Sequence, residues 1–172
     1  MDLKSHIRSV PDFPKKGILF YDITTLVKDA KAFKETIDQL YGLVKGKKYD
    51  KVAAIESRGF IFAAPLALML GCGFVIIRKP GKLPAEVISQ SYSLEYGKNT
   101  LEVHKDAIKP GERVLLVDDL LATGGTMEAA ASLVEKLGGK VETLLFVINL
   151  AFLPGAKRLE KYDKRYLITY NE

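Results

Sequence analysis

Two adjacent carboxylates and a glycine-rich turn follow one another in residues 114–126, Val-Leu-Leu-Val-Asp-Asp-Leu-Leu-Ala-Thr-Gly-Gly-Thr. The four apolar residues 114–117 are typical of a buried parallel strand, and this pattern places Asp118 and Asp119 where that strand ends. Small residues at 122–126 predict a turn, and a helical pattern follows over 127–137. One continuous segment thus brings together a strand, an acid pair and the start of a helix.

A glycine-rich turn beside an acid pair suits a sugar phosphate as the ligand. Open α/β sheets bind ligands just outside the carboxyl ends of their strands, and free amides of a glycine-rich turn at a helix N-terminus bind phosphate. Two carboxylates beside such a turn can accept hydrogen bonds from a vicinal diol. The ligand that fits is a ribose 5-phosphate, unless the acids merely cap the turn and the glycines merely permit it. The residues expected to hold the phosphate are Ala122, Thr123, Gly124, Gly125 and Thr126.

Other phosphate motifs are absent from the sequence. A P-loop needs Gly-Lys followed by Ser or Thr, and none of the four Gly-Lys pairs, at 46, 81, 97 and 139, has that residue. A Gly-x-Gly-x-x-Gly fingerprint is also missing, and Gly71-Cys-Gly73 precedes an apolar run instead of following one. The sequence therefore supports neither a P-loop ATPase nor a Rossmann dehydrogenase.

The rest of the chain alternates apolar strand patterns with helical ones. Strands are predicted at 18–23, 52–55, 74–78, 114–117, 141–150 and 166–170. Helices are predicted at 3–10, at 30–44 after the N-cap Asp29, at 59–70, at 127–137 and, briefly, from Pro154. The polar segment 79–109 predicts a hairpin or a mobile excursion. This order predicts an α/β fold, with a mainly parallel twisted sheet flanked by helices, in one domain over residues 1–172.

The composition further restricts the class of protein that the sequence can encode. A chain of 172 residues that is 48% hydrophobic and 27% charged suits one soluble core. The net charge of +5 suits a phosphorylated substrate as well as it suits nucleic acid. Cys72 is the only cysteine, so no internal disulfide can form, and we expect a cytoplasmic protein. Residues 60–77 carry no charge, but Pro65 and Gly71-Cys-Gly73 divide them, so no membrane span is expected.

Residues 114–126 resemble the phosphoribosyl pyrophosphate (PRPP) signature of the type I phosphoribosyltransferases. The resemblance covers nearly the whole chain and is strongest with the adenine-specific members of that family. Some members have Asp where Glu56 stands and a basic residue where Tyr21 stands. The further matching motifs are Pro-Asp-Phe-Pro at 11–14, residues 17–22, Glu-Ser-Arg-Gly at 56–59, residues 78–84 and Tyr-Ser-Leu-Glu-Tyr-Gly at 92–97.

The resemblance implies a type I phosphoribosyltransferase fold with a flexible loop at about 79–109 and a small N-terminal hood. It implies a pentosyltransferase that converts adenine and PRPP to AMP and pyrophosphate, as in purine salvage. The implied cofactor is Mg²⁺, held mainly by substrate and water, so no metal site built from the protein alone is expected. A homodimer is implied, with no nucleic-acid or membrane partner.

The resemblance also assigns site residues. Asp118 and Asp119 would face the ribose hydroxyls, directly or through Mg²⁺ and water. Arg58 and Glu95 would be catalytic, with Glu95 taking or returning the proton on adenine, and Tyr96 would shield the site. Leu19, Phe20 and Tyr21 would bind adenine. The residues implied for pyrophosphate are Glu56, Ser57, Arg58, Arg78, Lys79 and Lys82, with a cis peptide in the 56–58 loop of some members.

Plainer interpretations stay open for several of these residues. The cations at 78–82 suit a flexible phosphate clamp, but a solvated basic loop has the same composition. Without the family, Phe20 reads as a core residue and Glu95 as a solvent-facing one. The same fold could also accept xanthine, hypoxanthine or orotate. A regulator that binds PRPP and acts on nucleic acid would need a DNA- or RNA-reading element, which the sequence does not suggest.

Overall fold

The computed structural model describes residues 1–94 and 97–172, which form two compact units, 1–39 and 40–172. The first unit holds the short 3₁₀ helix η1 (Leu3–His6), strands β1 (Arg8–Pro11) and β2 (Leu19–Asp22), and helix α1 (Thr24–Val27). Strands β1 and β2 pair antiparallel, with Val10 opposite Phe20. The helix predicted over 3–10 is therefore wrong beyond His6, because the backbone from Arg8 onward is extended and pairs with β2.

Helix α2 (Ala30–Val44) runs from the first unit into the second and has the predicted bounds. Its N-cap is also as predicted, because the Asp29 carboxylate accepts a hydrogen bond of 2.9 Å from the amide of Ala32. Ile37, Leu40 and Val44 are buried along one face. This spacing is that of an amphipathic helix.

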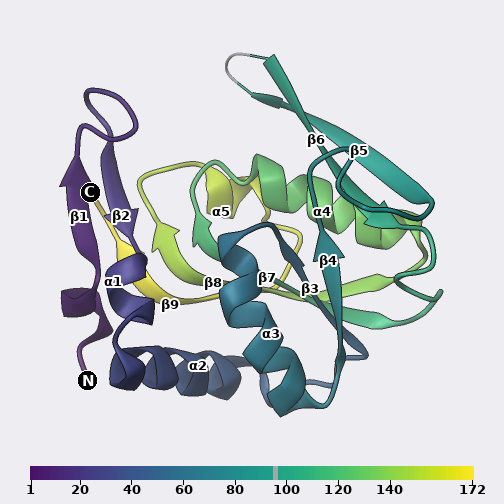
Figure 1. The fold of residues 1–172 in the computed structure, drawn as a ribbon, viewed down its shortest axis with the longest axis horizontal. Helices are drawn as coiled ribbons and strands as arrows, with labels where there is room; N and C mark the ends of the chain where they lie inside the picture. Colours follow the sequence, from purple (N-terminus) through teal and green to yellow (C-terminus); the bar gives the residue numbers. More distant parts are fainter. Residues whose placement is uncertain (95–96) are drawn as a thin grey trace. The chain divides into compact units, whose positions relative to one another are not determined.

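The second unit is built on a five-stranded parallel sheet in the order β4-β3-β7-β8-β9 (Figure 1). This arrangement confirms the predicted α/β class, with strands and helices alternating along the chain. The strands are β3 (Lys51–Ile55), β4 (Gly73–Ile77), β7 (Arg113–Leu121), β8 (Lys140–Leu150) and β9 (Lys164–Tyr170). The helices are α3 (Arg58–Leu70), α4 (Gly125–Lys136) and the short α5 (Gly155–Arg158).

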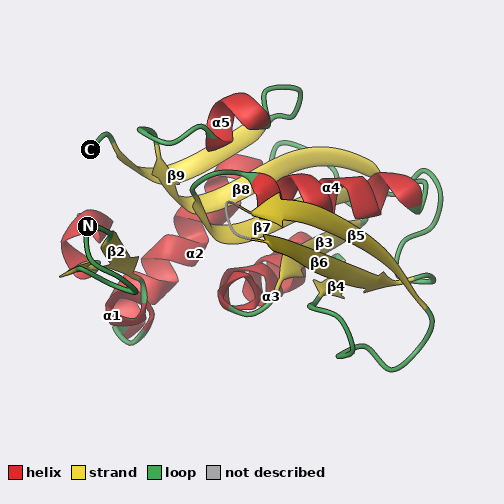
Figure 2. Ribbon diagram, turned by 90° about the horizontal axis from the view of Figure 1, so that it is seen from above, coloured by secondary structure: helices red, strands yellow, loops and turns green. Residues whose placement is uncertain are grey.

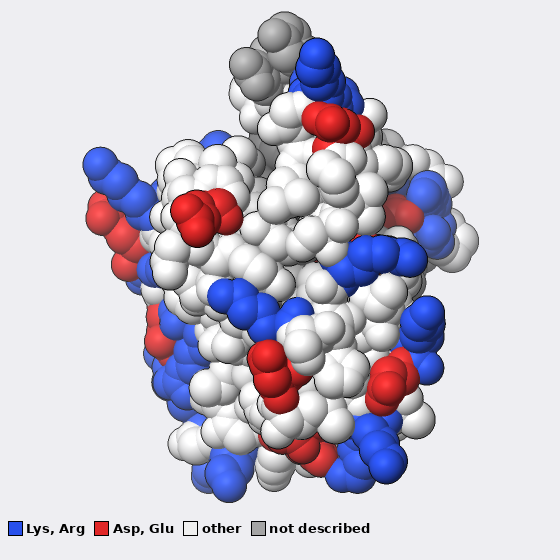
Figure 3. Space-filling model, turned by 90° about the vertical axis from the view of Figure 1, so that its left-hand side faces the viewer, with Lys and Arg blue, Asp and Glu red and all other residues white. Residues whose placement is uncertain are grey.

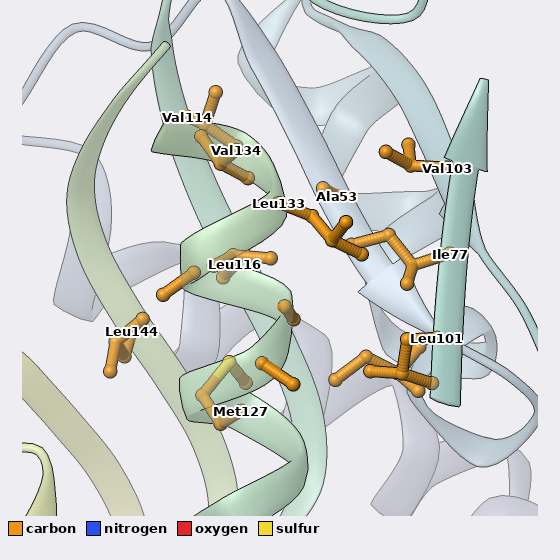
Figure 4. Packing of buried hydrophobic residues seen from close by; sticks show 14 of the residues in the cluster. Ala53, Ile77, Leu101, Val103, Val114, Leu116, Met127, Leu133, Val134 and Leu144 are labelled. Carbon is orange, nitrogen blue, oxygen red and sulfur yellow. The ribbon is translucent and has the colours of Figure 1, made fainter. Parts of the chain in front are cut away.

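The polar segment after β4 contains an antiparallel hairpin of β5 (Val87–Leu94) and β6 (Gly97–His104), which confirms that part of the prediction for 79–109. The hairpin lies beside α4 (Figure 2). Figure 4 shows Leu101 and Val103 of β6 in the core that also holds Ile77, Leu116 and Leu133. The hairpin is therefore anchored by buried apolar side chains at the end away from residues 95 and 96.

Helix α3 and strand β4 account for the long uncharged stretch at 60–77. Gly71 ends the helix in the left-handed region, with φ +68°. The absence of charge over 59–70 predicts a helix buried on all sides, but this prediction is wrong, because Phe62 is fully buried whereas Leu68 is 84% exposed. Among the residues described, none of the helices has the length and apolar character needed to cross a membrane.

Candidate active site

Strand β7 continues four residues beyond its predicted end, and the acid pair lies within it. Its pairing with β3 stops at Val117, opposite Ala54. Its pairing with β8 continues through Asp118 to Leu121. The two carboxylates therefore stand where the sheet loses one neighbour of β7 but keeps the other, which opens space beside them at the carboxyl end of β3.

The glycine-rich turn follows directly and leads into α4. Gly124 is the N-cap residue with φ +86°, a conformation that glycine adopts without steric cost. Helix α4 begins at Gly125, two residues before the predicted start. The first amides of this helix lack partners within it, and its dipole favours an anion at this end. Residues 122–126 thus have the geometry of a phosphate site, and we call them the phosphate turn.

One cavity of about 490 Å³ joins these features. It brings together the acid pair, most of the turn and residues 56–58, whereas Gly125, Arg78 and Lys82 are not among the described residues that line it. The lining residues with predicted roles are Glu56, Ser57, Arg58, Lys79, Asp118, Asp119, Ala122, Thr123, Gly124 and Thr126. The others are Ile55, Tyr92, Asn99, Leu101, Leu120, Leu121, Met127 and Phe146.

The two acids differ in their surroundings. Asp119 accepts a hydrogen bond from Arg58, with 2.6 Å between Oδ2 and Nε. Burial, and then the charge and hydrogen bonding of neighbouring Asp119, raise the pKa of Asp118 well above its usual value. Asp118 Oδ1 also accepts the backbone amide of Asp119. The surroundings of Asp118 therefore disfavour its ionised form.

Glu56 contacts three residues of the basic segment 78–82, which follows β4. Its carboxylate accepts hydrogen bonds from the Lys79 amide at 2.7 Å and the Lys82 ammonium at 2.8 Å. The Arg78 guanidinium lies 3.5 Å away. Burial raises the pKa of Glu56, but the bonds from Lys82 and the Lys79 amide and the charges of Lys82 and Arg78 outweigh it and lower that pKa to about 2. The peptide bond between Glu56 and Ser57 is cis.

The hairpin adds two cavity residues that the sequence did not reveal. Tyr92 and Asn99 stand opposite each other on β5 and β6, and both line the cavity. The Tyr92 hydroxyl accepts a hydrogen bond of 3.1 Å from the Thr126 hydroxyl in the phosphate turn. The motif at 92–97 contained Tyr92, but only the packing of the hairpin on α4 shows that its side chain reaches the turn.

Helix α5 supports the turn from behind. The Gly155 amide donates to the Ala122 carbonyl at 3.0 Å. Arg158 bonds the Glu128 carboxylate in the first turn of α4, and its side chain lies beside Gly124 and Gly125. These supporting residues carry no motif, so sequence reasoning alone had no signal for them.

The predicted adenine-binding residues lie in the first unit. Leu19 is 47% exposed, Phe20 is half-buried and Tyr21 is buried. The rings of Phe20 and Phe13 form an edge-to-face pair, with centroids 5.1 Å apart. Glu95 and Tyr96 fall outside the described residues.

The described residues contain no group of three or more His, Cys, Asp or Glu side chains that could hold a metal ion. What they offer a divalent cation is the carboxyl pair on β7, one member of which already bonds Arg58. A hard ion such as Mg²⁺ accepts one or two carboxylates when substrate phosphates and water supply the remaining ligands. The donor set therefore fits a cation that arrives with a phosphorylated substrate.

A parallel α/β sheet, an acid pair and a glycine-rich turn at a helix N-terminus meet at one cavity, which is the arrangement expected of an enzyme that acts on a sugar phosphate. The phosphoribosyl transferase domain family matches residues 22–171, and the chain belongs to this family. Within the family it falls among the adenine-specific enzymes, which transfer the 5-phosphoribosyl group from PRPP to adenine and give AMP and pyrophosphate.

The relatives that support this placement match almost the full chain. The adenine phosphoribosyltransferase of Caldanaerobacter subterraneus subsp. tengcongensis is 58% identical over 169 residues, 98% of each chain. The crystal structure of the Thermoanaerobacter pseudethanolicus enzyme has a TM-score of 0.96 at 57% identity and covers 98% of both chains. The Saccharomyces cerevisiae enzyme, solved with an imino-altritol bisphosphate and adenine, has a TM-score of 0.91 at 40% identity, with 96% of each chain covered.

Proposed function

We propose that the cavity at the ends of β3 and β7 is where this chain transfers a phosphoribosyl group to adenine. The observation that carries the proposal is that one space adjoins a phosphate turn, an acid pair and the Glu56–Arg58 turn. In the reaction, the anomeric carbon loses pyrophosphate and gains a purine nitrogen. Positive charge develops on the sugar and negative charge on the leaving group, so both ends need fixed partners.

The sugar is held at two points. Backbone amides of 122–126 and the hydroxyls of Thr123 and Thr126 donate to the 5-phosphate at the N-terminus of α4. Asp118 and Asp119 accept hydrogen bonds from the ribose hydroxyls. Because Asp119 bonds Arg58 in this structure, the arriving diol competes for that carboxylate and releases the guanidinium toward the pyrophosphate.

The leaving pyrophosphate is balanced by cations on the other side of the cavity. Arg58 and Lys79 line the space directly. Arg78 and Lys82 do not line it and are paired with Glu56. We propose that Glu56 holds this basic segment in place, so that its cations face the leaving group without a large loss of conformational entropy.

Mg²⁺ is the proposed cofactor. Phosphoribosyltransferases generally use it together with PRPP, and the β7 acids would hold it through water or through the ribose hydroxyls. When bound, the ion would neutralise part of the charge of the pyrophosphate. The raised pKa of Asp118 fits this role, because a nearby cation favours the ionised form of that carboxyl group.

The adenine site is proposed from the family resemblance. Phe20 stacks on the purine, the backbone of Leu19 and Tyr21 reads its edge, and Glu95 takes the proton that adenine loses, or returns it in the reverse reaction. Tyr96 shields the site from water. The solved yeast relative contains adenine, which supports adenine as the base for this chain.

We also propose a homodimer without a nucleic-acid partner, in the cytoplasm. Large apolar side chains are exposed on α3 and on the edge strand β4, and a second copy could bury them. They are Ile61, Leu68, Met69, Phe74 and Ile76. On the face drawn in Figure 3, the blue and red side chains of the described residues are interspersed. Nucleic-acid binding calls instead for a basic patch or stripe.

A panel of bases tests the proposed reaction. Enzyme, PRPP and Mg²⁺ are mixed with adenine, hypoxanthine, xanthine or orotate in turn, and pyrophosphate release is measured. Only adenine should give rapid release, because a site built for one hydrogen-bonding edge leaves polar groups unpaired with another. Equal or faster release with a different base would overturn the adenine assignment.

Replacement of Glu95 tests the proton-transfer role. Glu95→Ala should lower the rate of base transfer about 100-fold, since general acid–base groups contribute factors of this order. Glu86→Ala is the matched control, because Glu86 enters the same hairpin, its side chain is 84% exposed and it pairs only loosely with Lys105 at 3.6 Å. Equal single-turnover rates for Glu95→Ala and the wild type would contradict the proposal that Glu95 transfers the proton.

A further inference from the structure

We propose that Tyr92 is a further ligand of the 5-phosphate and that it links this phosphate to the hairpin. The proposal rests on the function proposed above and adds a residue outside the glycine-rich turn. Its basis is position: Tyr92 lines the cavity together with Thr123, Gly124 and Thr126. Its ring edge lies 3.4 Å from the point where a Cβ on Gly125 would stand. The phenol is therefore in contact with the turn that cradles the phosphate.

The hydroxyl of Tyr92 can donate to that phosphate. In this structure the Thr126 hydroxyl donates to the Tyr92 oxygen at 3.1 Å. The proton of Tyr92 is then available, and no described residue accepts it. Because the two hydroxyls lie 3.1 Å apart, a phosphate oxygen bound at the N-terminus of α4 would be able to accept a hydrogen bond from both. A bond from a neutral hydroxyl to a charged phosphate is stronger than one between neutral groups.

The same residue ties the hairpin to α4. Two positions before it on β5, the side chain of Gln90 accepts hydrogen bonds from Ser132 and Lys136 of α4. Tyr92 extends this line of contacts to the first turn of the helix through Thr126. Beyond Leu94, β5 leads to residues 95 and 96, where the general acid–base residue is proposed. Tyr92 is therefore the contact through which the hairpin meets the turn that binds the phosphate.

Tyr92→Phe tests the proposal. Removal of the hydroxyl should weaken ribose 5-phosphate binding, measured by calorimetry, about tenfold. It should raise the KM for PRPP by a similar factor and leave kcat within about twofold, because the phosphate keeps the same charge throughout the reaction. The KM for adenine should not change. Unaltered ribose 5-phosphate affinity in Tyr92→Phe would overturn the assignment.

Two control variants separate a ligand from a structural contact. Tyr162→Phe removes a hydroxyl that donates to Glu135 on the same helix at 2.6 Å, and it should bind ribose 5-phosphate like the wild type. Gln90→Leu loosens the hairpin from α4 without a change to the residues that line the cavity. If Gln90→Leu weakens ribose 5-phosphate binding as much as Tyr92→Phe does, then Tyr92 acts only by placing the hairpin, and its assignment as a ligand is wrong.

The experiment also distinguishes this inference from the function it rests on. Binding of ribose 5-phosphate is measured without turnover, so it reports on Tyr92 even if no base is transferred. A wild-type protein that binds ribose 5-phosphate but releases no pyrophosphate with any base would contradict the proposed reaction alone. Normal adenine transfer with a Tyr92→Phe variant of unchanged affinity would contradict the Tyr92 assignment alone.

Discussion

Replacement of both β7 acids, Asp118→Asn with Asp119→Asn, should lower kcat/KM for PRPP about 1000-fold. Asparagine keeps the shape of each side chain but removes the negative charge that faces the developing positive charge on the sugar, and lost electrostatic partners cost factors of this order. Steady-state kinetics with PRPP as the varied substrate measure the effect. Asp106→Asn is the control, because Asp106 is an exposed acid that does not line the cavity.

The single change Asp118→Asn should at the same time make the protein more stable near pH 7. Burial and the neighbouring charge of Asp119 raise the pKa of Asp118 in the folded state. An acid whose folded pKa is raised destabilises the fold as pH rises above its unfolded value of about 3.9. The gain in the free energy of unfolding should therefore be present at neutral pH and vanish below about pH 4.

Urea unfolding at the two pH values measures that gain. Opposite changes in stability and activity would indicate that the acid pair is kept for binding at the expense of the fold. A double variant with wild-type turnover would contradict the ribose assignment. A loss of stability in Asp118→Asn at neutral pH would contradict the account of its charge.

The parts of the site that are continuous in sequence could be predicted. The acid pair and the phosphate turn lie within nine residues, and the strand–turn–helix pattern around them fixes their relation locally. The sequence does not predict the meeting of Arg58 with Asp119, although it places both near the carboxyl ends of parallel strands, which share one edge of a sheet. The sequence could not give the 2.6 Å bond between them, because that depends on β3 and β7 being neighbours.

The parts of the site that depend on packing could not be predicted. Tyr92 reaches the phosphate turn only because the hairpin register sets it opposite Asn99 and the hairpin packs on α4. At the N-terminus, the sequence predicts a helix over residues 3–10. Antiparallel pairing with β2 satisfies the backbone of Arg8–Pro11 instead. Such pairing depends on a second strand, and a pattern of this length carries no signal for its partner.

A second large loss of activity is expected for Gly155→Ala, because Gly155 of α5 contacts the segment that enters the phosphate turn. A Cβ at this position would stand 2.4 Å from the Ala122 carbonyl oxygen and 2.8 Å from Leu121 Cδ1. Since both atoms belong to the segment that enters the turn, either α5 or the turn has to move. Overpacking of this kind costs about 3 kcal/mol of stability. A displacement of the turn by about 1 Å should lower kcat/KM for PRPP about 100-fold.

Gly42→Ala is the matched control for Gly155→Ala, because nothing lies within 4 Å of the Cβ it would add on α2. Alanine is the better helix former, so this variant should be more stable by about 0.5–1 kcal/mol, with unchanged kinetics. Thermal unfolding and PRPP kinetics of the two variants separate a general glycine effect from a steric one. If Gly155→Ala retains both its stability and its KM for PRPP, then α5 does not hold the phosphate turn in place, and the turn keeps its shape through its own backbone alone.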